Sequence, residues 1–270
     1  MQHTILITGS TDGIGLETAK LLVSRGHRVL LHGRNPGKLK DAERMLVELS
    51  TEEHIESYRA DLSSMAEVEA LATAVAERHD KLDVLINNAG VYGASATVTQ
   101  DGLDVRFAVN TIAPYLLTQR LLGLLGSSGR VINLSSAAQA SVNSQALAGS
   151  VQLSDGAAYA QSKLALTMWS RDLALSLNGK GPAIVAVNPG SMLGTKMVQQ
   201  TFSVAGGDIR IGADILCRAA LSAEFAQASG RYFDNDSGQF AAPHADALNA
   251  QKTKDVVDTI DGILAKVLAK

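Results

Sequence analysis

The sequence places a phenol and an ammonium group, those of Tyr159 and Lys163, four positions apart. Both groups can exchange protons, and at this spacing they lie on one face of a helix, which the apolar periodicity predicts over Ala157 to Leu177. Of the five tyrosines only Tyr159 has a lysine at this distance, and it follows the pair Ser135-Ser136 at the end of a predicted strand. Taken alone, the two residues fit an active site and an ordinary helix surface alike.

A glycine-rich turn near the start of the chain has the spacing of a phosphate-binding turn. It reads Thr8-Gly9-Ser10-Thr11-Asp12-Gly13-Ile14-Gly15, between a predicted strand and a predicted helix. Gly9 allows a tight turn, Gly13 lets the backbone approach phosphates at the positive end of the helix, and Gly15 lets the helix pack closely on the strand. The pattern predicts a site for the pyrophosphate of a dinucleotide, and the alternative is an ordinary strand-to-helix turn.

The end of the second predicted strand indicates which dinucleotide would bind. The sequence there reads His32-Gly33-Arg34-Asn35, without the carboxylate that usually binds the ribose hydroxyls of NAD(H). Gly33 leaves space and Arg34 is a planar bidentate donor, which together suit the 2′-phosphate of NADP(H). Asp12 in the phosphate turn opposes this interpretation, and Arg34 could instead be a solvated surface residue. NADP(H) is therefore preferred, and NAD(H) stays open.

Short apolar runs alternate with longer amphipathic segments along the chain, so each predicted strand is followed by a crossover long enough for the next to run parallel. This alternation predicts a doubly wound α/β domain. The predicted strands are Thr4 to Thr8, Arg28 to His32, Ile55 to Arg59, Val84 to Ile86, Arg130 to Leu134 and Ala183 to Val187. Predicted helices between them include Ile14 to Ser24, Ala66 to Arg78, Leu103 to Leu125 and Ala157 to Leu177.

Composition excludes several classes of function. Lys and Arg number 24 against 27 Asp and Glu, so no basic excess exists to bind nucleic acid or an anionic membrane. Cys217 is the only cysteine, and the six histidines lack metal-ligand spacing, so we expect neither an internal disulfide nor a metal site. The first residues show no cationic segment followed by a long apolar one, which predicts a cytoplasmic protein.

Together these features resemble the short-chain dehydrogenase/reductase family, in particular its retinol-dehydrogenase-like branch, over nearly the whole chain. The resemblance implies a single-domain Rossmann fold over residues 1–270, a doubly wound parallel sheet of about seven strands with helices on both faces. Residues 1–125 would mainly bind the dinucleotide, and residues 126–270 would form the catalytic and substrate half. Beyond the glycine turn, the matching residues are Asp61-Leu62, Asn87-Asn88-Ala89-Gly90, Asn110, Ser136, Tyr159, Lys163 and Pro189-Gly190.

The resemblance further implies an oxidoreductase that transfers a hydride between NADP(H) and a small carbonyl or alcohol substrate. Tyr159 would exchange a proton with the substrate oxygen, its pKa lowered by Lys163 and by the positive nicotinamide ring. Lys163 would also hold the nicotinamide ribose. Ser136, with Ser135 as the alternative, would donate a hydrogen bond to the oxygen that becomes negative. Asn110 would hold a water that relays protons through Lys163.

The same resemblance implies a set of cofactor contacts, with Asp61 meeting the adenine amino group and Leu62 lining its ring. Thr195 stands five residues after Gly190, where the family usually has four. The implied cofactor-binding residues are Gly9, Ser10, Asp12, Gly13, Ile14, Gly15, Arg34, Asn35, Asp61, Leu62, Asn88, Ala89, Gly90, Tyr159, Lys163, Pro189, Gly190, Met192 and Thr195.

Two segments would shape the substrate pocket. The 22 residues between Ser136 and Tyr159 exceed what compact members carry, and Met192 to Gly207 would form a mobile lid. Because Lys196 is the only cation in the two segments, we expect an uncharged apolar ketone, aldehyde or secondary alcohol as substrate. Apolar side chains expected near the mouth of the site are Val142, Leu147, Val151 and Leu153 from the first segment, and Met197, Val198 and Phe202, which could instead pack on the core, from the second.

The chain ends in an amphipathic segment, Lys254 to Leu268, with apolar residues at helical spacing and an acidic polar face. Such a helix is expected to dock on its own or a neighbouring subunit rather than on a membrane, and we expect a homo-oligomer, either a dimer or a tetramer. Two other functions stay open. A non-catalytic dinucleotide-sensing regulator would have a broken Ser/Tyr/Lys set, and an epimerase or dehydratase of nucleotide sugars would need a larger substrate domain.

Overall fold

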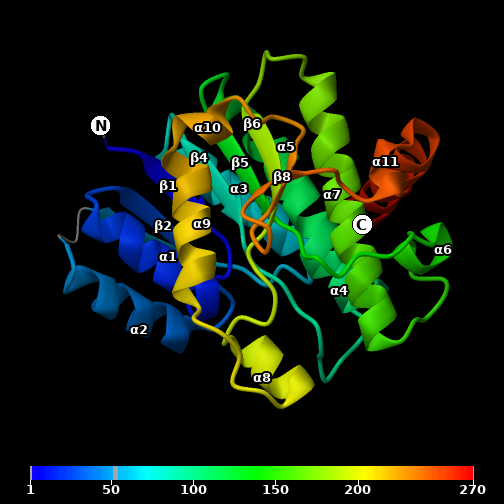
Figure 1. Cartoon of the computed structure of the whole chain (residues 1–270), viewed down its shortest axis with the longest axis horizontal. Helices are drawn as coiled ribbons and strands as arrows, with labels where there is room; N and C mark the ends of the chain where they lie inside the picture. The colour runs from blue at the N-terminus through cyan, green and yellow to red at the C-terminus, as the bar shows by residue number, and fades with distance from the viewer. Residues whose placement is uncertain (1, 51–53, 270) are drawn as a thin grey trace.

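The strands form one sheet in the order β3-β2-β1-β4-β5-β6-β7-β8, at the centre of Figure 1. A computed structural model describes residues 2–50 and 54–269; both ends of the predicted domain, Met1 and Lys270, lie outside the described residues. The strands are β1 (Thr4–Ile7), β2 (Arg28–Gly33), β3 (Ile55–Arg59), β4 (Val84–Asn87), β5 (Arg130–Leu134), β6 (Ala183–Asn188), β7 (Tyr232–Asp234) and β8 (Gln239–Ala241).

The predicted doubly wound fold is confirmed, with one strand more than the expected seven. Strands β1 to β7 pair in parallel, whereas β8 pairs antiparallel with β7. A tight turn that includes Gly238, whose φ is +69°, returns the chain along β7. The sequence analysis missed β8 because a three-residue edge strand has too little periodicity to be recognised.

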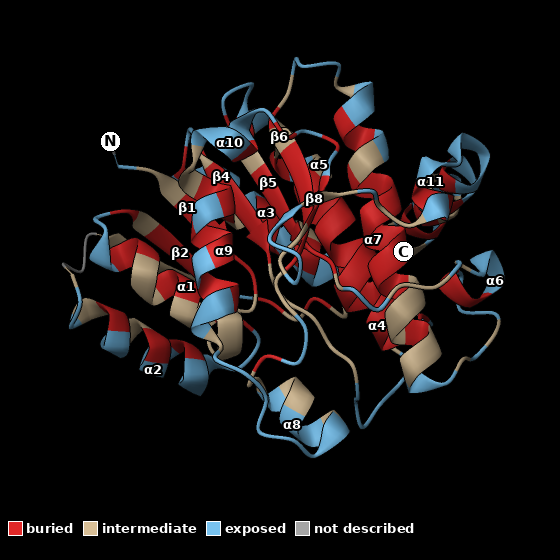
Figure 2. Ribbon diagram, in the orientation of Figure 1, coloured by how far each residue is buried: buried red, intermediate tan, exposed pale blue. Residues whose placement is uncertain are grey.

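Helices cover both faces of the sheet, and successive strand residues point to opposite layers. Leu6 and Leu30 pack with residues of α3, α5 and α7, whereas Ile5 and Val29 pack with residues of α1, α2 and α9. Figure 2 shows these inner helix faces and the strands as buried. The longer helices are α1 (Gly13–Ser24), α2 (Pro36–Val47), α3 (Met65–Arg78), α5 (Ala113–Leu125), α7 (Asp155–Ser176), α9 (Arg210–Leu221) and α11 (Ala250–Val267).

The helix predicted over Leu103 to Leu125 is interrupted. A short α4 (Val105–Phe107) leads into a π-helical segment, η2 (Ala108–Ile112), before α5 begins. Pro114 lacks an N–H, so it cannot donate to the carbonyl of Asn110 four residues earlier. The N–H of Ala113 donates to the carbonyl of Ala108, five residues earlier, which is the hydrogen-bond pattern of a π-helix. The proline therefore explains the wider turn at Asn110.

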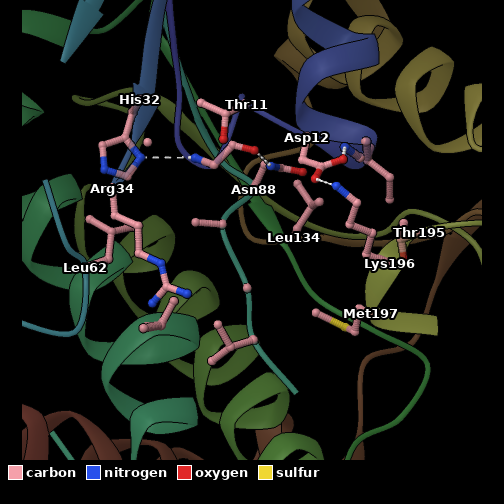
Figure 3. Close-up of a pocket in the computed structure, with 18 of the residues that line it drawn as sticks. Thr11, Asp12, His32, Arg34, Leu62, Asn88, Leu134, Thr195, Lys196 and Met197 are labelled. Carbon is pink, nitrogen blue, oxygen red and sulfur yellow. Dashed lines mark hydrogen bonds and ion pairs between the residues drawn. The ribbon is translucent and has the colours of Figure 1, made fainter. Parts of the chain in front are cut away.

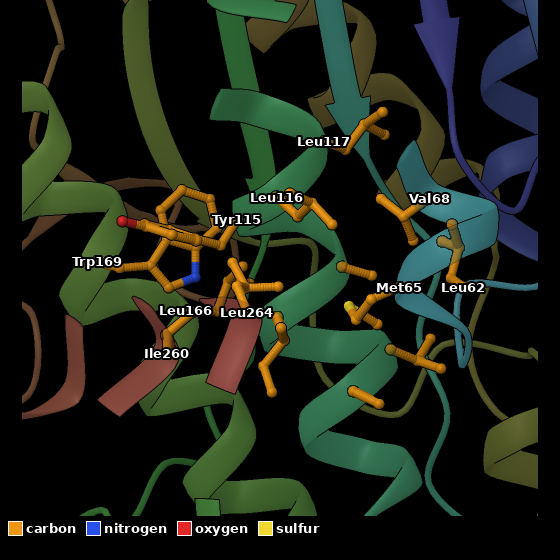
Figure 4. Packing of buried hydrophobic residues seen from close by; sticks show 14 of the residues in the cluster. Leu62, Met65, Val68, Tyr115, Leu116, Leu117, Leu166, Trp169, Ile260 and Leu264 are labelled. Carbon is orange, nitrogen blue, oxygen red and sulfur yellow. The ribbon is translucent and has the colours of Figure 1, made fainter. Parts of the chain in front are cut away.

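The C-terminal helix α11 docks on its own chain. Its apolar face, which includes Ile260 and Leu264, packs against α7 and α5 around the fully buried Trp169 (Figure 4). The ring of Tyr115 meets Trp169 edge-on at 5.5 Å, and its hydroxyl donates a hydrogen bond of 2.9 Å to Asp261. Within residues 2–50 and 54–269, no helix combines the length and the apolar composition needed to cross a membrane.

Candidate active site

A cavity of about 440 Å³ opens where the carboxyl ends of β1, β2, β4, β5 and β6 meet (Figure 3). The strand order reverses direction at β1, and such a switch point leaves a crevice between the two halves of the sheet. The predicted site residues in its lining are Gly9, Asp12, Gly13, Ile14, Arg34, Asp61, Leu62, Asn88, Ala89, Gly90, Tyr159, Lys163, Pro189 and Thr195.

The glycine turn has a backbone conformation that residues with a Cβ atom rarely adopt. Gly9 and Gly13 have φ angles of +65° and +61°. A Cβ atom at Gly9 would lie 2.9 Å from the Cα atom of Ala89, and one at Gly15 would lie 2.4 Å from Nδ2 of Asn88. The same Asn88 amide donates to the Thr8 carbonyl at 2.8 Å. The glycines therefore let α1 and the segment after β4 approach β1 closely.

His32 holds the glycine turn through a hydrogen bond to its backbone. It was not among the predicted site residues. Its Nδ1 atom accepts a hydrogen bond of 3.1 Å from the N–H of Gly9, and its Nε2 atom lies 3.1 Å from the carbonyl oxygen of Ala60. This arrangement requires a neutral ring with the proton on Nε2. Burial lowers the pKa of His32 to about 4, so the ring stays neutral at pH 7.

Two cations line the far end of the cavity. Arg34 is exposed directly after β2, and Lys38, which the sequence analysis did not name, follows on the first turn of α2. Asn35 does not line the cavity; its side chain instead accepts the N–H of Lys38 at 3.0 Å and caps α2. Nearby, the Asp61 carboxylate accepts the N–H of Ser63 at 2.9 Å.

Asp12 joins the glycine turn to two lysines. Its carboxylate pairs with the ammonium of Lys196 and lies 3.6 Å from that of Lys38. It also accepts the N–H of Gly13 at 2.9 Å. Although burial acts to raise the pKa of Asp12, the hydrogen bond and charge of Lys196 lower it overall. The carboxylate is therefore ionised and partly neutralised by its neighbours.

Lys163 lies at the other end of the cavity, buried among polar groups. Its ammonium donates a hydrogen bond of 2.7 Å to the carbonyl of Leu134 at the end of β5 and lies 5.8 Å from the centre of the Tyr159 ring. A Cβ atom at Gly90 would come within 3.5 Å of this ammonium, so the glycine keeps space open beside it. Burial lowers the pKa of Lys163 to about 8.

The sequence predicted a lowered pKa for Tyr159, but the residues of the protein on their own raise it, so this prediction is wrong without the nicotinamide ring. Burial raises the pKa of the phenol, hydrogen bonding with Ser136 opposes the rise, and the nearby Tyr92 adds to it. The Ser136 hydroxyl thus faces the phenol, although the side chain lies outside the cavity lining. Ser135, the alternative, lines the cavity, but its hydroxyl is buried and lies 2.7 Å from that of Thr167.

Asn110 is fully buried, and its side chain joins two segments of the site. Its Oδ1 atom accepts the N–H of Val91 at 2.8 Å, and its Nδ2 atom donates to the Val91 carbonyl and to the hydroxyl of Ser162. Ser162 is the residue before Lys163 on α7. The asparagine therefore ties the segment after β4 to the helix that carries Tyr159 and Lys163.

Several predicted residues lie elsewhere in the described part of the chain. Ser10 is buried, and its hydroxyl accepts the N–H of His32 at 2.9 Å. Met192 is exposed, with a left-handed φ of +55° at the base of the predicted lid. Besides the catalytic candidates Asn110 and Ser136, the predicted residues outside the cavity lining are Ser10, Gly15, Asn35, Gly190 and Met192.

The insertion before Tyr159 does not shape the pocket as expected. It contains the short helix α6 (Ser144–Leu147), and Leu147 is buried in the core beside α7 and α11. Its other apolar residues, Val142, Val151 and Leu153, pack partly buried against the same core. None of the four lines the cavity, so the prediction that placed these side chains at the mouth of the site is wrong. They bury apolar surface in the core instead, and Val151 and Leu153 lie beside Gly102 and Asp104.

A second cavity, of about 640 Å³, adjoins the catalytic end and shares Gly90, Val91 and Met197 with the first. Tyr92, which the sequence analysis did not single out, lies in its wall with its ring 5.0 Å from that of Tyr159. The remaining lining residues are Gly93, Ala94, Ser95, Asp155, Gln200 and Thr201.

Comparison with known proteins identifies the family. Residues 3–206 match the family model described as short chain dehydrogenase. The chain is 32% identical to retinol dehydrogenase 13 of Homo sapiens, over 90% of this chain and 79% of that protein. It is 33% identical to retinol dehydrogenase 12 of Bos taurus, over 89% and 80% respectively. The solved Pseudomonas aeruginosa RhlG/NADP active-site complex is 27% identical, with a TM-score of 0.71 over 87% of this chain and 95% of that one. The chain therefore belongs to the short-chain dehydrogenase family of oxidoreductases and resembles its retinol dehydrogenases.

Proposed function

We propose that this short-chain dehydrogenase transfers a hydride between NADP(H) and an uncharged carbonyl or alcohol substrate, with Ser136, Tyr159 and Lys163 as its catalytic residues. One observation carries the proposal. A single cavity has the glycine turn and the exposed Arg34 at one end, and Tyr159 and Lys163 at the other. A dinucleotide lying in it would have its reactive ring beside the phenol.

The residues present fit an NADP(H) molecule. Arg34 and Lys38 offer two exposed cations to a 2′-phosphate, with no carboxylate at Gly33 to repel it. Gly90 leaves room beside Lys163 for a ribose. The Pseudomonas aeruginosa relative, described as a complex with NADP, supports the same preference. When bound, the cofactor supplies or accepts the hydride.

The pKa directions suit proton transfer in the direction of reduction. A raised pKa keeps the Tyr159 phenol protonated at pH 7, so that it can donate its proton to the substrate oxygen. Lys163, with a pKa of about 8, is mainly charged at that pH and stabilises negative charge as it forms on the phenol. Ser136 donates a hydrogen bond to the same substrate oxygen. Asn110 positions α7 through its hydrogen bond to Ser162 and would hold a water through which Lys163 is reprotonated.

The substrate class follows from the charges beside the catalytic end. Lys196 is paired with Asp12, and the Asp155 carboxylate is paired with Arg106, at 2.6 Å. An anionic substrate would lose hydration without gaining an unpaired cation, whereas an apolar one would gain from burial against Met197 and Tyr92. Gln200 and Thr201 could in addition bind a neutral polar group.

The proposal is tested with the purified chain, NADPH or NADH, and a panel of neutral cyclic ketones and keto acids of similar size, followed by absorbance at 340 nm. We expect the highest kcat/KM with NADPH and a neutral ketone. Higher values for the keto acids would contradict the substrate class, and Lys196 would then be the first residue to test as their anchor. If neither cofactor were oxidised with any substrate while both still bound, a dinucleotide-sensing regulator would be the better interpretation.

A further inference from the structure

The short helix α8 (Lys196–Phe202) covers the two cavities but has no fully buried side chain. Figure 2 shows it in tan and pale blue only, at the lower edge of the molecule. Two backbone hydrogen bonds of 2.8 Å join the segments before and after α8: the N–H of Gly194 donates to the carbonyl of Gly207, and the N–H of Gly207 donates to the carbonyl of Met192. A segment with so little buried surface opens at low free-energy cost, so individual side-chain contacts decide how long it stays closed.

Two such contacts lie at opposite ends of α8. At its first residue, Lys196 pairs with Asp12 of the glycine turn. At its last, the half-exposed ring of Phe202 meets the ring of Tyr92 edge-on, with centroids 5.9 Å apart and an interplanar angle of 62°. This is a favourable geometry for two aromatic rings. The helix is thus attached on the cofactor side by charge and on the substrate side by Tyr92.

Tyr92 is held in place by residues outside α8. Its ring also packs on Tyr159, and its backbone carbonyl accepts a hydrogen bond of 3.4 Å from Arg106. Arg106 is fully buried and paired with the carboxylates of Asp104 and Asp155, the latter being the first residue of α7. Tyr92 is therefore a fixed wall that separates the catalytic phenol from the end of α8.

We propose that Tyr92 is a specificity-determining residue, which limits substrate size by holding Phe202 over the entrance to Tyr159. A small neutral ketone fits beneath the closed pair of rings, whereas a bulky one has to separate Phe202 from Tyr92 before its carbonyl reaches the phenol. This inference rests on the proposed function, because it places the substrate carbonyl at Tyr159. It predicts that the ring of Tyr92, and not its hydroxyl, sets the size limit.

The first test compares kcat/KM for a bulky neutral ketone, decalone, and a small one, cyclohexanone, in Tyr92→Ala and in the matched control Tyr92→Phe. An aromatic contact of ordinary strength corresponds to about a two- to tenfold change in the closed fraction of α8. We therefore expect the decalone-to-cyclohexanone ratio to rise by about that factor in Tyr92→Ala, mainly through KM, and to stay at the wild-type value in Tyr92→Phe. Phe202→Ala should raise the ratio similarly, and the double variant no further.

The second test needs no turnover. Trypsin cleaves after lysine and arginine, and the side chains of Lys196, within the lid, and Arg210, three residues after it, are 63% and 73% exposed. Cleavage at these two sites should be about two- to tenfold faster in Tyr92→Ala than in the wild type, and unchanged in Tyr92→Phe. Equal cleavage rates in all three proteins would show that Tyr92 does not hold the lid and would overturn the inference.

Failure of the Tyr92 inference can be distinguished from failure of the proposed function. An active wild type whose Tyr92→Ala variant keeps the wild-type ratio overturns the role of Tyr92 alone and leaves the proposed function standing. A wild type that reduces no ketone overturns the proposed function and the specificity role with it, whatever the cleavage rates.

Discussion

The N–H of Gly9 donates a hydrogen bond of 3.1 Å to Nδ1 of His32, joining the glycine turn to the carboxyl end of β2. Only a neutral imidazole can accept this bond while its Nε2 proton is shared with the carbonyl of Ala60. The shape of the phosphate turn therefore depends on the protonation state of a buried histidine.

Acid should destabilise the fold through His32. Its pKa is about 4 in the folded chain against 6.5 for an ordinary histidine, so between these values the unfolded chain binds more protons. The free energy of unfolding should fall as the pH drops from 6.5 to 4, by up to about 3 kcal/mol from this residue. Urea unfolding at pH 7 and pH 4.5 should show a smaller loss in His32→Gln than in the wild type, and parallel losses would contradict the assignment.

Lys163 should make the free energy of unfolding depend on pH in the same direction as His32, but at high pH. Its pKa is about 8 when folded and 10.5 ordinarily, so from pH 8 to 10 the unfolded chain again binds more protons and stability rises with pH. The wild type should gain about 1 to 3 kcal/mol of unfolding free energy relative to Lys163→Met over this range. Urea titrations of both proteins at pH 7.5 and pH 10 measure the difference, and a constant offset would mean that the ammonium is not buried as described.

Cofactor choice should depend on Arg34. Arg34→Ala should weaken NADPH binding by about 1 to 3 kcal/mol, the usual effect of losing a charge-assisted hydrogen bond, and should leave NADH binding nearly unchanged. Lys40→Ala is the matched control, because Lys40 is an exposed cation on α2, six residues after Arg34, but lies outside the cavity lining. Dissociation constants for NADPH and NADH are measured by fluorescence titration of the wild type and both variants. An equal loss of affinity for both cofactors in Arg34→Ala, or a wild-type preference for NADH, would refute NADP(H) as the cofactor.

The fold was predictable because its signals are local and repeated. Apolar runs such as Val29 to Leu31 mark strands buried on both faces, and the long crossovers between them require parallel pairing. The break at Asn110 was missed although its cause, Pro114, stands in the sequence. A proline in the first turn is normal for a helix, so the apolar periodicity on either side concealed the junction.

The cavity lining was predictable where it follows a strand end, as at Gly9, Arg34 and Asn88, since the sheet topology brings those positions together. His32 and Tyr92 were missed because their roles depend on which neighbours the fold places beside them. The insertion around Leu147 was misplaced because apolar composition does not distinguish a ligand pocket from a core. The homo-oligomer and the cytoplasmic location stay predictions.

The most direct test of the proposed function is the turnover of Tyr159→Phe. The phenol is the only proposed proton donor to the substrate, so its loss should lower kcat with NADPH and a good neutral ketone by at least about a hundredfold. The dissociation constant for NADPH should change little. Tyr115→Phe, which removes a buried phenol beside α11, is the control and should keep nearly full activity. A Tyr159→Phe enzyme with near wild-type kcat would contradict the proposed mechanism.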